Sequence, residues 1–480
     1  MSEIKSIALE VESQQLITSD QAWHYKIVPK SDQVEDLLSF YADEDAWTES
    51  LQSELEMLFG KRVVLEKCQT DVIHQTLGKY YRKGKTNGQA KEKSISPADA
   101  EDFVHRLIGE AEDIGSSDIH IESYEEKCRV RLRIDGKLVE KYVIPGSDYP
   151  AFVNKLKIRA NLDIAEKRLP QDGRIQFSSG KTQFDIRVSV LPTLHGEKVV
   201  MRLLSRDATN IDIQKMGLHP VQLKHYMEGA KKSHGIILIS GPTGSGKTTT
   251  LYATLKVLNE EYTNIVTVED PIEYTLEGIN QVQLKEDIGL TFAGALRSFL
   301  RQDPDIIMLG EIRDKETAQM AIRAALTGHL VLSTIHTNSA WGTVSRLVDM
   351  GVPSYLLAST LNVTVAQRLV RLLCPNCKQS EPFHQKLFPG NFIPPEKTTA
   401  HYRPVGCDVC YFTGYKGRKA VYEVIPIDVD LSKQIKENNY EVSQLLESKK
   451  ISRLMDNAFQ LFHTGETTIE EVYSILMSNY

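Results

Sequence analysis

Several features are missing from this chain of 480 residues, and each absence excludes a class of protein. No apolar run reaches about 18 residues, so no transmembrane helix is expected. The N-terminal stretch MSEIKSIALEVESQQ lacks the profile of a signal peptide. An excess of positive charge is also absent: the formal net charge is −7 and the pI is near 6.1, which argues against a nonspecific nucleic-acid coat. We therefore expect a cytoplasmic protein that meets a membrane only through partners.

What is present fits a folded chain of several domains. Apolar content of 41% and charged content of 25% are ordinary globular values, and the length suggests more than one core. Polar, Gly/Lys-rich residues closed by Pro97 indicate a flexible linker. We predict an N-terminal adaptor or docking domain (1–81), a linker (82–97), a small α+β domain (98–206), a second linker (207–220) and an α/β nucleotide-binding domain (221–480).

The most informative motif is a phosphate-binding loop. An apolar β-branched run at 236–239 leads into GPTGSGKT, and a helix-forming stretch follows. The glycines allow consecutive backbone N–H groups to surround phosphate oxygens at a helix N-terminus. A glycine-rich turn that matches by chance is the alternative, and the flanking strand and helix count against it. The candidate nucleotide-binding residues are Gly241, Pro242, Thr243, Gly244, Ser245, Gly246, Lys247, Thr248 and Thr249.

Strands and helices alternate after this loop, as in a parallel α/β sheet. Strands are expected at 236–240, 265–268, 306–310 and 330–335. Ligands of such sheets bind at the carboxyl ends of the strands. The side chains that follow these ends are therefore expected to converge on the phosphates, and they include Glu269, Asp270, Glu273, Glu311 and His336.

Glu311 follows its apolar strand directly, which would place a carboxylate near Mg²⁺ and the γ-phosphate to orient the attacking water. The alternative is an exposed glutamate that stabilises a helix start. Glu269 and Glu273 are candidates for positioning water or metal. His329 and His336 either contact phosphate or are ordinary structural histidines.

Four arginines are further candidates for contacting phosphate. In the α+β domain, alternation puts Phe184 and Ile186 in the core and Arg187 on the other face, and Arg202 lies inside an apolar run. From the pattern alone, pairing with local carboxylates is the favoured interpretation of Arg187 and Arg202, and phosphate contact across a boundary is the alternative. Arg297 and Arg301 lie one helical turn apart. They suit stabilisation of phosphate charge from a neighbouring subunit, and the alternative is that they solubilise the helix or form salt bridges.

Four of the six cysteines form two CxxC pairs within 374–410. Each pair can supply two corners of a tetrahedron, which predicts a structural zinc site. Disulfides are disfavoured in a chain without a secretion signal. The predicted zinc ligands are Cys374, Cys377, Cys407 and Cys410, whereas Cys68 and Cys128 are expected to be inert thiols. A strand at 415–425 and a helical tail at 428–479 should complete the chain.

Together these motifs resemble the secretion ATPases that drive type II secretion and type IV pilus assembly. The resemblance runs from about 97 to 425 and includes SSDIHIE, LPQDGRI, LPTLHGEKVVMRLL, GPTGSGKTTTLYA, TVEDPIEY, LRSFLRQDPDIIMLGEIRD, LTGHLVLSTIHTN and AQRLVR followed by the cysteines. It implies a RecA-like P-loop motor domain preceded by a PAS-like α+β domain and an N-terminal adaptor. Because retraction ATPases of this superfamily lack the four-cysteine insertion, the chain is more similar to the extension or secretion branch.

The resemblance also implies an activity and partners. The family comprises cytoplasmic homohexamers, peripheral to the inner membrane, whose Mg-dependent ATP hydrolysis works an inner-membrane platform protein. A membrane-anchored docking protein would contact the N-terminal domain.

Carried across residue by residue, Lys247 and Thr248 bind ATP and Mg²⁺, and Glu311 belongs to Walker B. Glu269 and Glu273 fall in the aspartate box, and His329 and His336 in the histidine box. The four arginines align with nucleotide-contacting arginines of the family, which replaces the local-pair interpretation of Arg187 and Arg202.

Two other functions compete with this interpretation. A nucleic-acid motor on a similar core would need a basic channel, and the acidic overall balance counts against it. A scaffold that binds ATP without hydrolysing it would have no need of the water-orienting carboxylate expected at Glu311.

Overall fold

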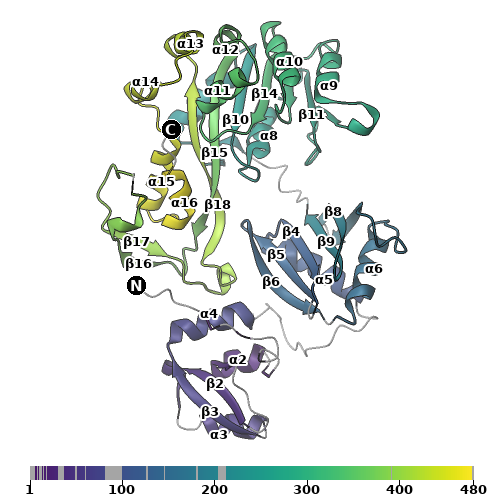
Figure 1. Cartoon of the computed structure of the whole chain (residues 1–480), viewed down its shortest axis with the longest axis vertical. Coiled ribbons are helices and arrows are strands. Elements are labelled where there is room, and N and C mark those ends of the chain that lie inside the picture. The colour runs from purple at the N-terminus through teal and green to yellow at the C-terminus, as the bar shows by residue number, and fades with distance from the viewer. Residues whose placement is uncertain are drawn as a thin grey trace.

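The computed structural model describes residues 6–7, 9, 13, 16–17, 19–30, 37–48, 51–59, 61–81, 100–125, 128–144, 146–179, 182–203, 212–390 and 392–477. The linker predicted at 82–97 lies outside these residues, as does the first part of the linker predicted at 207–220. Figure 1 shows three parts in chain order: a small purple part, a blue part with a curved sheet, and a large teal-to-yellow part.

The N-terminal part is a three-stranded sheet packed against helices. The strands β1 (Ile27–Pro29), β2 (Leu37–Asp43) and β3 (Arg62–Cys68) lie in the order β1-β2-β3. Around them lie α2 (Ser19–Tyr25), η1 (Glu44–Ala46), α3 (Leu51–Phe59) and α4 (Thr70–Tyr80). Phe40, Leu55, Ile73 and Leu77 are fully buried, so this part has a core of its own.

The second part is a six-stranded antiparallel sheet with two helices. Its elements are α5 (Ala100–Ile114), β4 (Asp118–Ser123), β5 (Cys128–Ile134), β6 (Lys137–Ile144), α6 (Tyr149–Arg159), β7 (Gln171–Ser179), β8 (Thr182–Thr193) and β9 (Gly196–Leu203). The strand order is β6-β5-β4-β9-β8-β7. Asp135 and Gly136 both have positive φ and turn β5 into β6. Phe184 and Ile186 are buried, as the alternation predicts, and this leaves Arg187 on the opposite face.

The third part is built on a seven-stranded sheet of order β12-β11-β13-β14-β10-β15-β18. Its strands are β10 (Gly235–Ser240), β11 (Ile265–Glu269), β12 (Asn280–Gln283), β13 (Ile306–Leu309), β14 (Leu330–Ile335), β15 (Leu361–Leu373) and β18 (Tyr415–Pro426). Neighbours are parallel except for β15 and β18. The four expected parallel strands are confirmed to within one residue, so this part has the predicted α/β fold.

Helices cover both faces of this sheet, which is why the central strands β10, β13 and β14 are largely apolar. They are η3 (Ile213–Lys215), α7 (Pro220–Ala230), α8 (Lys247–Leu258), η4 (Glu286–Ile288), α9 (Phe292–Phe299), α10 (Lys315–Leu326), α11 (Gly342–Asp349) and α12 (Ser354–Thr360). Along β10, Ile236 and Leu238 face the core shared with α9 to α12. Ile237 and Ile239 face the core shared with α7 and α8.

The remaining elements carry the cysteines and the tail. They are β16 (Gln379–Pro382), η5 (Gln385–Leu387), β17 (Ala400–Arg403), η6 (Asp408–Cys410), α13 (Val429–Lys436), α14 (Ser443–Ser448), α15 (Leu454–His463) and α16 (Ile469–Leu476). Phe383, Phe388, Phe459 and Phe462 form an aromatic core between them. Among the helices of the described residues, none has both the length and the apolar content needed to cross a bilayer.

Candidate nucleotide site and cysteine cluster

The phosphate-binding loop lies where the sequence places it, between β10 and α8. Gly241, Gly244 and Gly246 have φ values of +149°, +79° and +85°, which glycine adopts without steric cost. A Cβ on Gly241 would lie 2.4 Å from the carbonyl oxygen of Gln367. The loop conformation therefore requires glycine both for its backbone and for its close approach to β15.

Lys247 is the first residue of α8 and its side chain bends back over the loop. Its Nζ donates to the carbonyl oxygens of Gly241 at 2.8 Å and Pro242 at 3.1 Å. Burial lowers the pKa of the Lys247 ammonium, and the nearby Glu311 carboxylate opposes that change. A cation thus lies within the electrostatic reach of the carboxylate predicted to orient water.

β15 supports the loop from beneath, and the sequence analysis assigned no role to its residues. Gln367 donates from Nε2 to the Ser245 carbonyl at 2.7 Å and accepts from Thr250 Oγ1 at 2.9 Å. Arg368 donates to the carbonyls of Gln367 at 3.1 Å and Asn338 at 3.0 Å. The AQRLVR motif names these residues, but only the pairing of β15 with β10 shows that they buttress the loop.

Side chains from the carboxyl ends of β11, β13 and β14 meet beside the loop. His336 Nε2 lies 3.2 Å from Glu311 Oε2. Arg313, which the sequence analysis did not select, pairs with Glu311 and lies 3.7 Å from Asp270. Partial burial raises the pKa of Glu311, but the hydrogen bond from Arg313 and the charges of Arg313 and His336 outweigh it, so the net pKa lies below its usual range. Glu311 is therefore a carboxylate at neutral pH.

Glu269 and Glu273 lie in different environments. The Glu269 carboxylate is buried and accepts hydrogen bonds from Tyr252, from Thr267 at 2.7 Å and from Gln281 at 3.0 Å. These three donors hold the carboxylate at the end of β11 in this conformation. Glu273 is half-exposed and lies 3.6 Å from Arg187.

His329 lies apart from this group in the structure, and its contact with phosphate stays a prediction. It immediately precedes β14, whereas His336 immediately follows it. A six-residue strand puts the two residues about 20 Å apart, at opposite edges of the sheet. Nδ1 of His329 donates to the Ala324 carbonyl at 2.9 Å and so closes the turn after α10.

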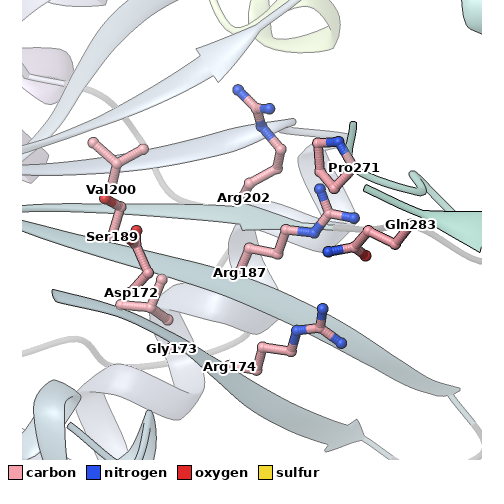
Figure 2. A pocket seen from close by; sticks show the side chains of 10 residues that line it. Asp172, Gly173, Arg174, Arg187, Ser189, Val200, Arg202, Pro271 and Gln283 are labelled. Carbon is pink, nitrogen blue, oxygen red and sulfur yellow. The ribbon is translucent and has the colours of Figure 1, made fainter. Parts of the chain in front are cut away.

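Three arginines form a row across β7, β8 and β9. Arg174 is paired in register with Arg187, and Arg187 with Arg202. They line a cavity of about 480 Å³ whose other wall includes Pro271 and Gln283 of the motor domain (Figure 2). Like charges directly opposite one another destabilise a sheet. The row is therefore better suited to binding an anion than to holding the sheet together.

The arginines of this row differ in the carboxylates that they contact. Arg202 Nε lies 3.0 Å from Asp118 within its own domain, in agreement with the local-pair interpretation. Arg187 instead crosses to the motor domain, where it binds the Ile272 carbonyl and approaches Glu273. Arg174 completes the row, and sequence spacing alone could not reveal its register.

Arg297 and Arg301 lie on the surface of the motor domain. The Arg297 side chain is 56% exposed and pairs with Glu316 on α10. Arg301 Nη1 donates to the Arg297 carbonyl at 2.9 Å, so the two residues lie one turn apart as expected. Among their recorded contacts within the described chain, none involves the phosphate-binding loop.

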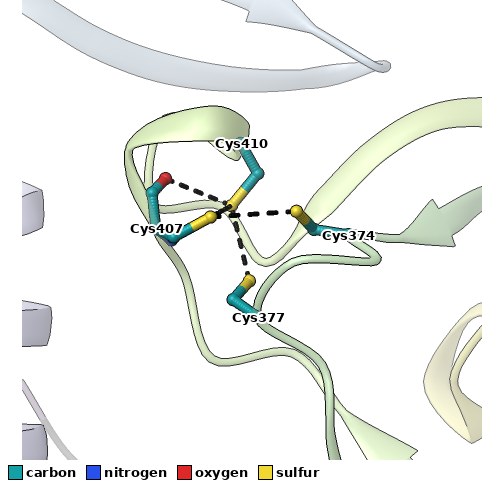
Figure 3. A group of neighbouring side chains, drawn as sticks. All are labelled: Cys374, Cys377, Cys407 and Cys410. Carbon is teal, nitrogen blue, oxygen red and sulfur yellow. Dashed lines mark hydrogen bonds between the residues drawn. The ribbon is translucent and has the colours of Figure 1, made fainter.

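The four predicted zinc ligands come together in one cluster (Figure 3). The Sγ atoms of Cys374 and Cys407 are 3.8 Å apart, and Cys410 Sγ lies 3.7 Å from those of Cys377 and Cys407. A disulfide would bring two sulfurs to about 2.05 Å, so these thiols are free. Backbone N–H groups of Gly406, Cys407 and Gly414 donate to the Cys377 and Cys410 sulfurs. Burial raises the pKa of both thiols, and these hydrogen bonds oppose that change.

Known proteins match this chain over most of its length. The model of a protein family described as Type II/IV secretion system protein matches residues 93–474 of this chain. The type IV pilus assembly ATPase PilB of Myxococcus xanthus is 48% identical over 387 residues, which are 79% of this chain and 68% of that protein. The type II secretion system protein E of Pseudomonas aeruginosa is 45% identical over 376 residues, 78% of this chain and 74% of that protein.

Solved structures agree. The pilus retraction motor PilT with bound ADP superposes with a TM-score of 0.54 at 26% identity, over 78% of this chain and 97% of that one. The ATPase DotB of Legionella pneumophila superposes with a TM-score of 0.62 at 20% identity, over 82% and 98% respectively, which shows a shared fold. With its phosphate-binding loop, its convergent Glu311 and these matches, the chain belongs to the type II/IV secretion system protein family, an ATPase family.

Proposed function

We propose that this protein is a mechanochemical ATPase that powers type IV pilus assembly or type II protein secretion. The observation that carries the proposal is the meeting of Glu311 and His336 beside the loop that bears Lys247. A loop that binds phosphates, a cation and a carboxylate held in its ionised form are what water attack on a γ-phosphate requires. The matched relatives are named as secretion and pilus ATPases rather than as nucleic-acid motors.

The chain's residues fit Mg-ATP. α8 begins at Lys247, directly after the glycine loop, and the free N–H groups at its start favour anions. Lys247 would contact the β- and γ-phosphates. The Thr248 hydroxyl would be a ligand for Mg²⁺, and the bound ion would neutralise phosphate charge. Glu311 orients the water, and Arg313 and His336 keep its carboxylate ionised and in place. Glu273 remains a candidate for positioning water or metal, released when Arg187 turns to phosphate.

The working form we propose is a cytoplasmic homohexamer peripheral to the inner membrane. Arg297 and Arg301 are exposed, and an exposed ion pair such as Arg297–Glu316 is weak enough to exchange for a phosphate of the neighbouring subunit. The arginine row of the second domain would close over the nucleotide as that domain moves against the motor. An inner-membrane platform protein would receive this motion, and a membrane-anchored protein would dock on the N-terminal domain.

The cysteine cluster fits zinc. A tetrahedron with Zn–S bonds of 2.3 Å has edges of about 3.8 Å, close to the 3.7–3.8 Å separations of the sulfurs. Cys374, Cys377, Cys407 and Cys410 would hold the ion, which would tie the chain between β15 and β18 into a fixed shape. A closed set of four thiolates has a structural rather than a catalytic role.

Cys407→Ser is expected to remove about one zinc per chain. It should also lower the unfolding midpoint of the motor domain by at least roughly 5 °C, because metal affinity contributes directly to folding. Metal analysis and calorimetry check this. Cys68→Ser, outside the cluster, is the control and should change neither quantity. Freshly purified wild type without zinc would remove the claim.

ATP turnover per chain is expected to rise at least tenfold as protein concentration drives assembly, because arginines supplied across a boundary act only in the ring. Turnover and particle size are measured in the same samples, with and without single- and double-stranded DNA or RNA. Equal turnover in monomer and ring would contradict the proposal. Strong stimulation by nucleic acid would favour the alternative motor instead.

A further inference from the structure

The turn that follows the last two cysteines has an unusual backbone. Tyr411 and Phe412 have φ values of +51° and +58°. Bulky residues rarely adopt this region, and such strain persists only where the surroundings impose it. Here two backbone hydrogen bonds close the turn beside the clustered thiols: Phe412 N–H donates to the Cys407 carbonyl at 2.9 Å, and Thr413 N–H to the Cys410 carbonyl at 3.0 Å. We call residues 407–414 the cysteine turn.

The cysteine turn presents Phe412 to the N-terminal domain. A Cβ on Gly78, in the last turn of α4, would lie 2.6 Å from Cγ of Phe412, so the ring rests directly on the helix backbone. The ring of Trp23 on α2 forms the wall beside it, with ring centroids 5.2 Å apart. The Phe412 ring thus fills a hollow between α4 and Trp23, and this hollow exists only because residue 78 is a glycine.

Charged residues make further contacts near the Phe412 ring. Arg403, on β17 between the two CxxC pairs, lies 3.8 Å from Asp71 of α4 and is held in place by Glu381 at 2.6 Å. Just after the cysteine turn, the N–H of Gly417 donates to Asp135 of the second domain at 2.9 Å. The cysteine-bearing segment therefore contacts the N-terminal domain, and the start of β18, which follows it directly, contacts the second domain.

We propose that the metal-bound cysteine turn is a latch that docks the N-terminal domain, residues 19–81, on the motor of its own chain. Metal loading sets whether the domain docks, because without metal the cysteines no longer hold Phe412 in its strained position. This inference rests on the zinc site proposed above and goes beyond ATP hydrolysis. According to this proposal, the N-terminal domain is free to move only when Phe412 has left its contact with Gly78 and Trp23.

Gly78→Ala tests the contact. Alanine favours helix more than glycine does, so the substitution should strengthen α4 while its methyl group collides with Phe412. Gly109→Ala in α5 is the matched control, because a Cβ there meets nothing within 4 Å. With the full chain kept below the concentration of assembly, only Gly78→Ala should increase the radius of gyration in small-angle scattering. It should also shift Trp23 emission to longer wavelength, measured as a difference from Trp23→Phe.

Zinc removal by a chelator tests the metal dependence on the wild-type chain. The same rise in radius and the same shift of Trp23 emission are expected, and zinc addition should reverse both. Gly78→Ala should keep its zinc. Identical behaviour of the two alanine variants would overturn the contact, and a zinc-free wild type that stays docked would overturn the metal dependence. Absence of zinc from purified protein would refute the metal site, while Gly78→Ala would still decide the contact. Docking that depends on concentration would place the contact between chains.

Discussion

Glu311→Gln is expected to lower the turnover number for ATP by at least roughly 10³-fold and to leave ATP affinity within a factor of about three. Glutamine keeps the size of the side chain and a hydrogen bond to Arg313, but it cannot draw a proton from water. The Lys247 ammonium and the glycine loop, which hold the phosphates, are unchanged. The measurement is single-turnover hydrolysis beside equilibrium binding of labelled ATP, with Glu260→Gln, an exposed glutamate beyond α8, as the control.

Other outcomes of this experiment have definite meanings. If Glu311→Gln loses ATP binding, the carboxylate serves the metal or the loop conformation instead of the water. If turnover survives, another carboxylate positions the water, and Glu273 is the stronger candidate because Glu269 is buried and already bonded to Tyr252, Thr267 and Gln281. A parallel measurement on Glu273→Gln would then show the larger loss.

Features with a local cause could be predicted from the sequence. The four parallel strands are apolar on both faces, so their runs of Ile, Val and Leu were recognisable without alternation. The glycine loop and the CxxC pairs were recognisable because spacing along the chain fixes their geometry. Glu311 was assigned from its place directly after a strand, and the structure puts it beside His336.

Features that depend on how strands pair, or on which end of a strand a residue lies, could not be predicted in this way. His329 and His336 both flank one strand, but only the second lies at the ligand-binding edge. β12 is short and polar, and β15 carries Gln367 and Arg368 in its interior, so neither stood out as a strand of the motor sheet. The arginine row depends on which residues of β7, β8 and β9 face each other, and the contact of Phe412 with Gly78 spans more than three hundred residues of sequence.

Arg297→Ala is expected to lower turnover of the assembled ring by roughly 10³-fold and to leave the slow turnover of dilute chains nearly unchanged. The reason is geometric: Arg297 is 56% exposed and paired with Glu316, on a surface that a neighbouring subunit can reach. The Arg301 guanidinium is oriented by its hydrogen bond to the Arg297 carbonyl, so Arg301→Ala should cause a smaller loss of turnover. Arg323→Ala, an exposed arginine of α10, is the control.

Mixing two inactive variants separates action within a chain from action across a boundary. In a ring, each interface joins two different surfaces, so an Arg297→Ala subunit with intact Glu311 can receive Arg297 from a Glu311→Gln neighbour. Random assembly restores about one site in four, and turnover should recover to that order. If Arg297 served its own subunit's nucleotide, the mixture would stay as inactive as its components. Recovery would therefore locate the arginine in the neighbouring subunit, and its absence would withdraw Arg297 and Arg301 from the interface.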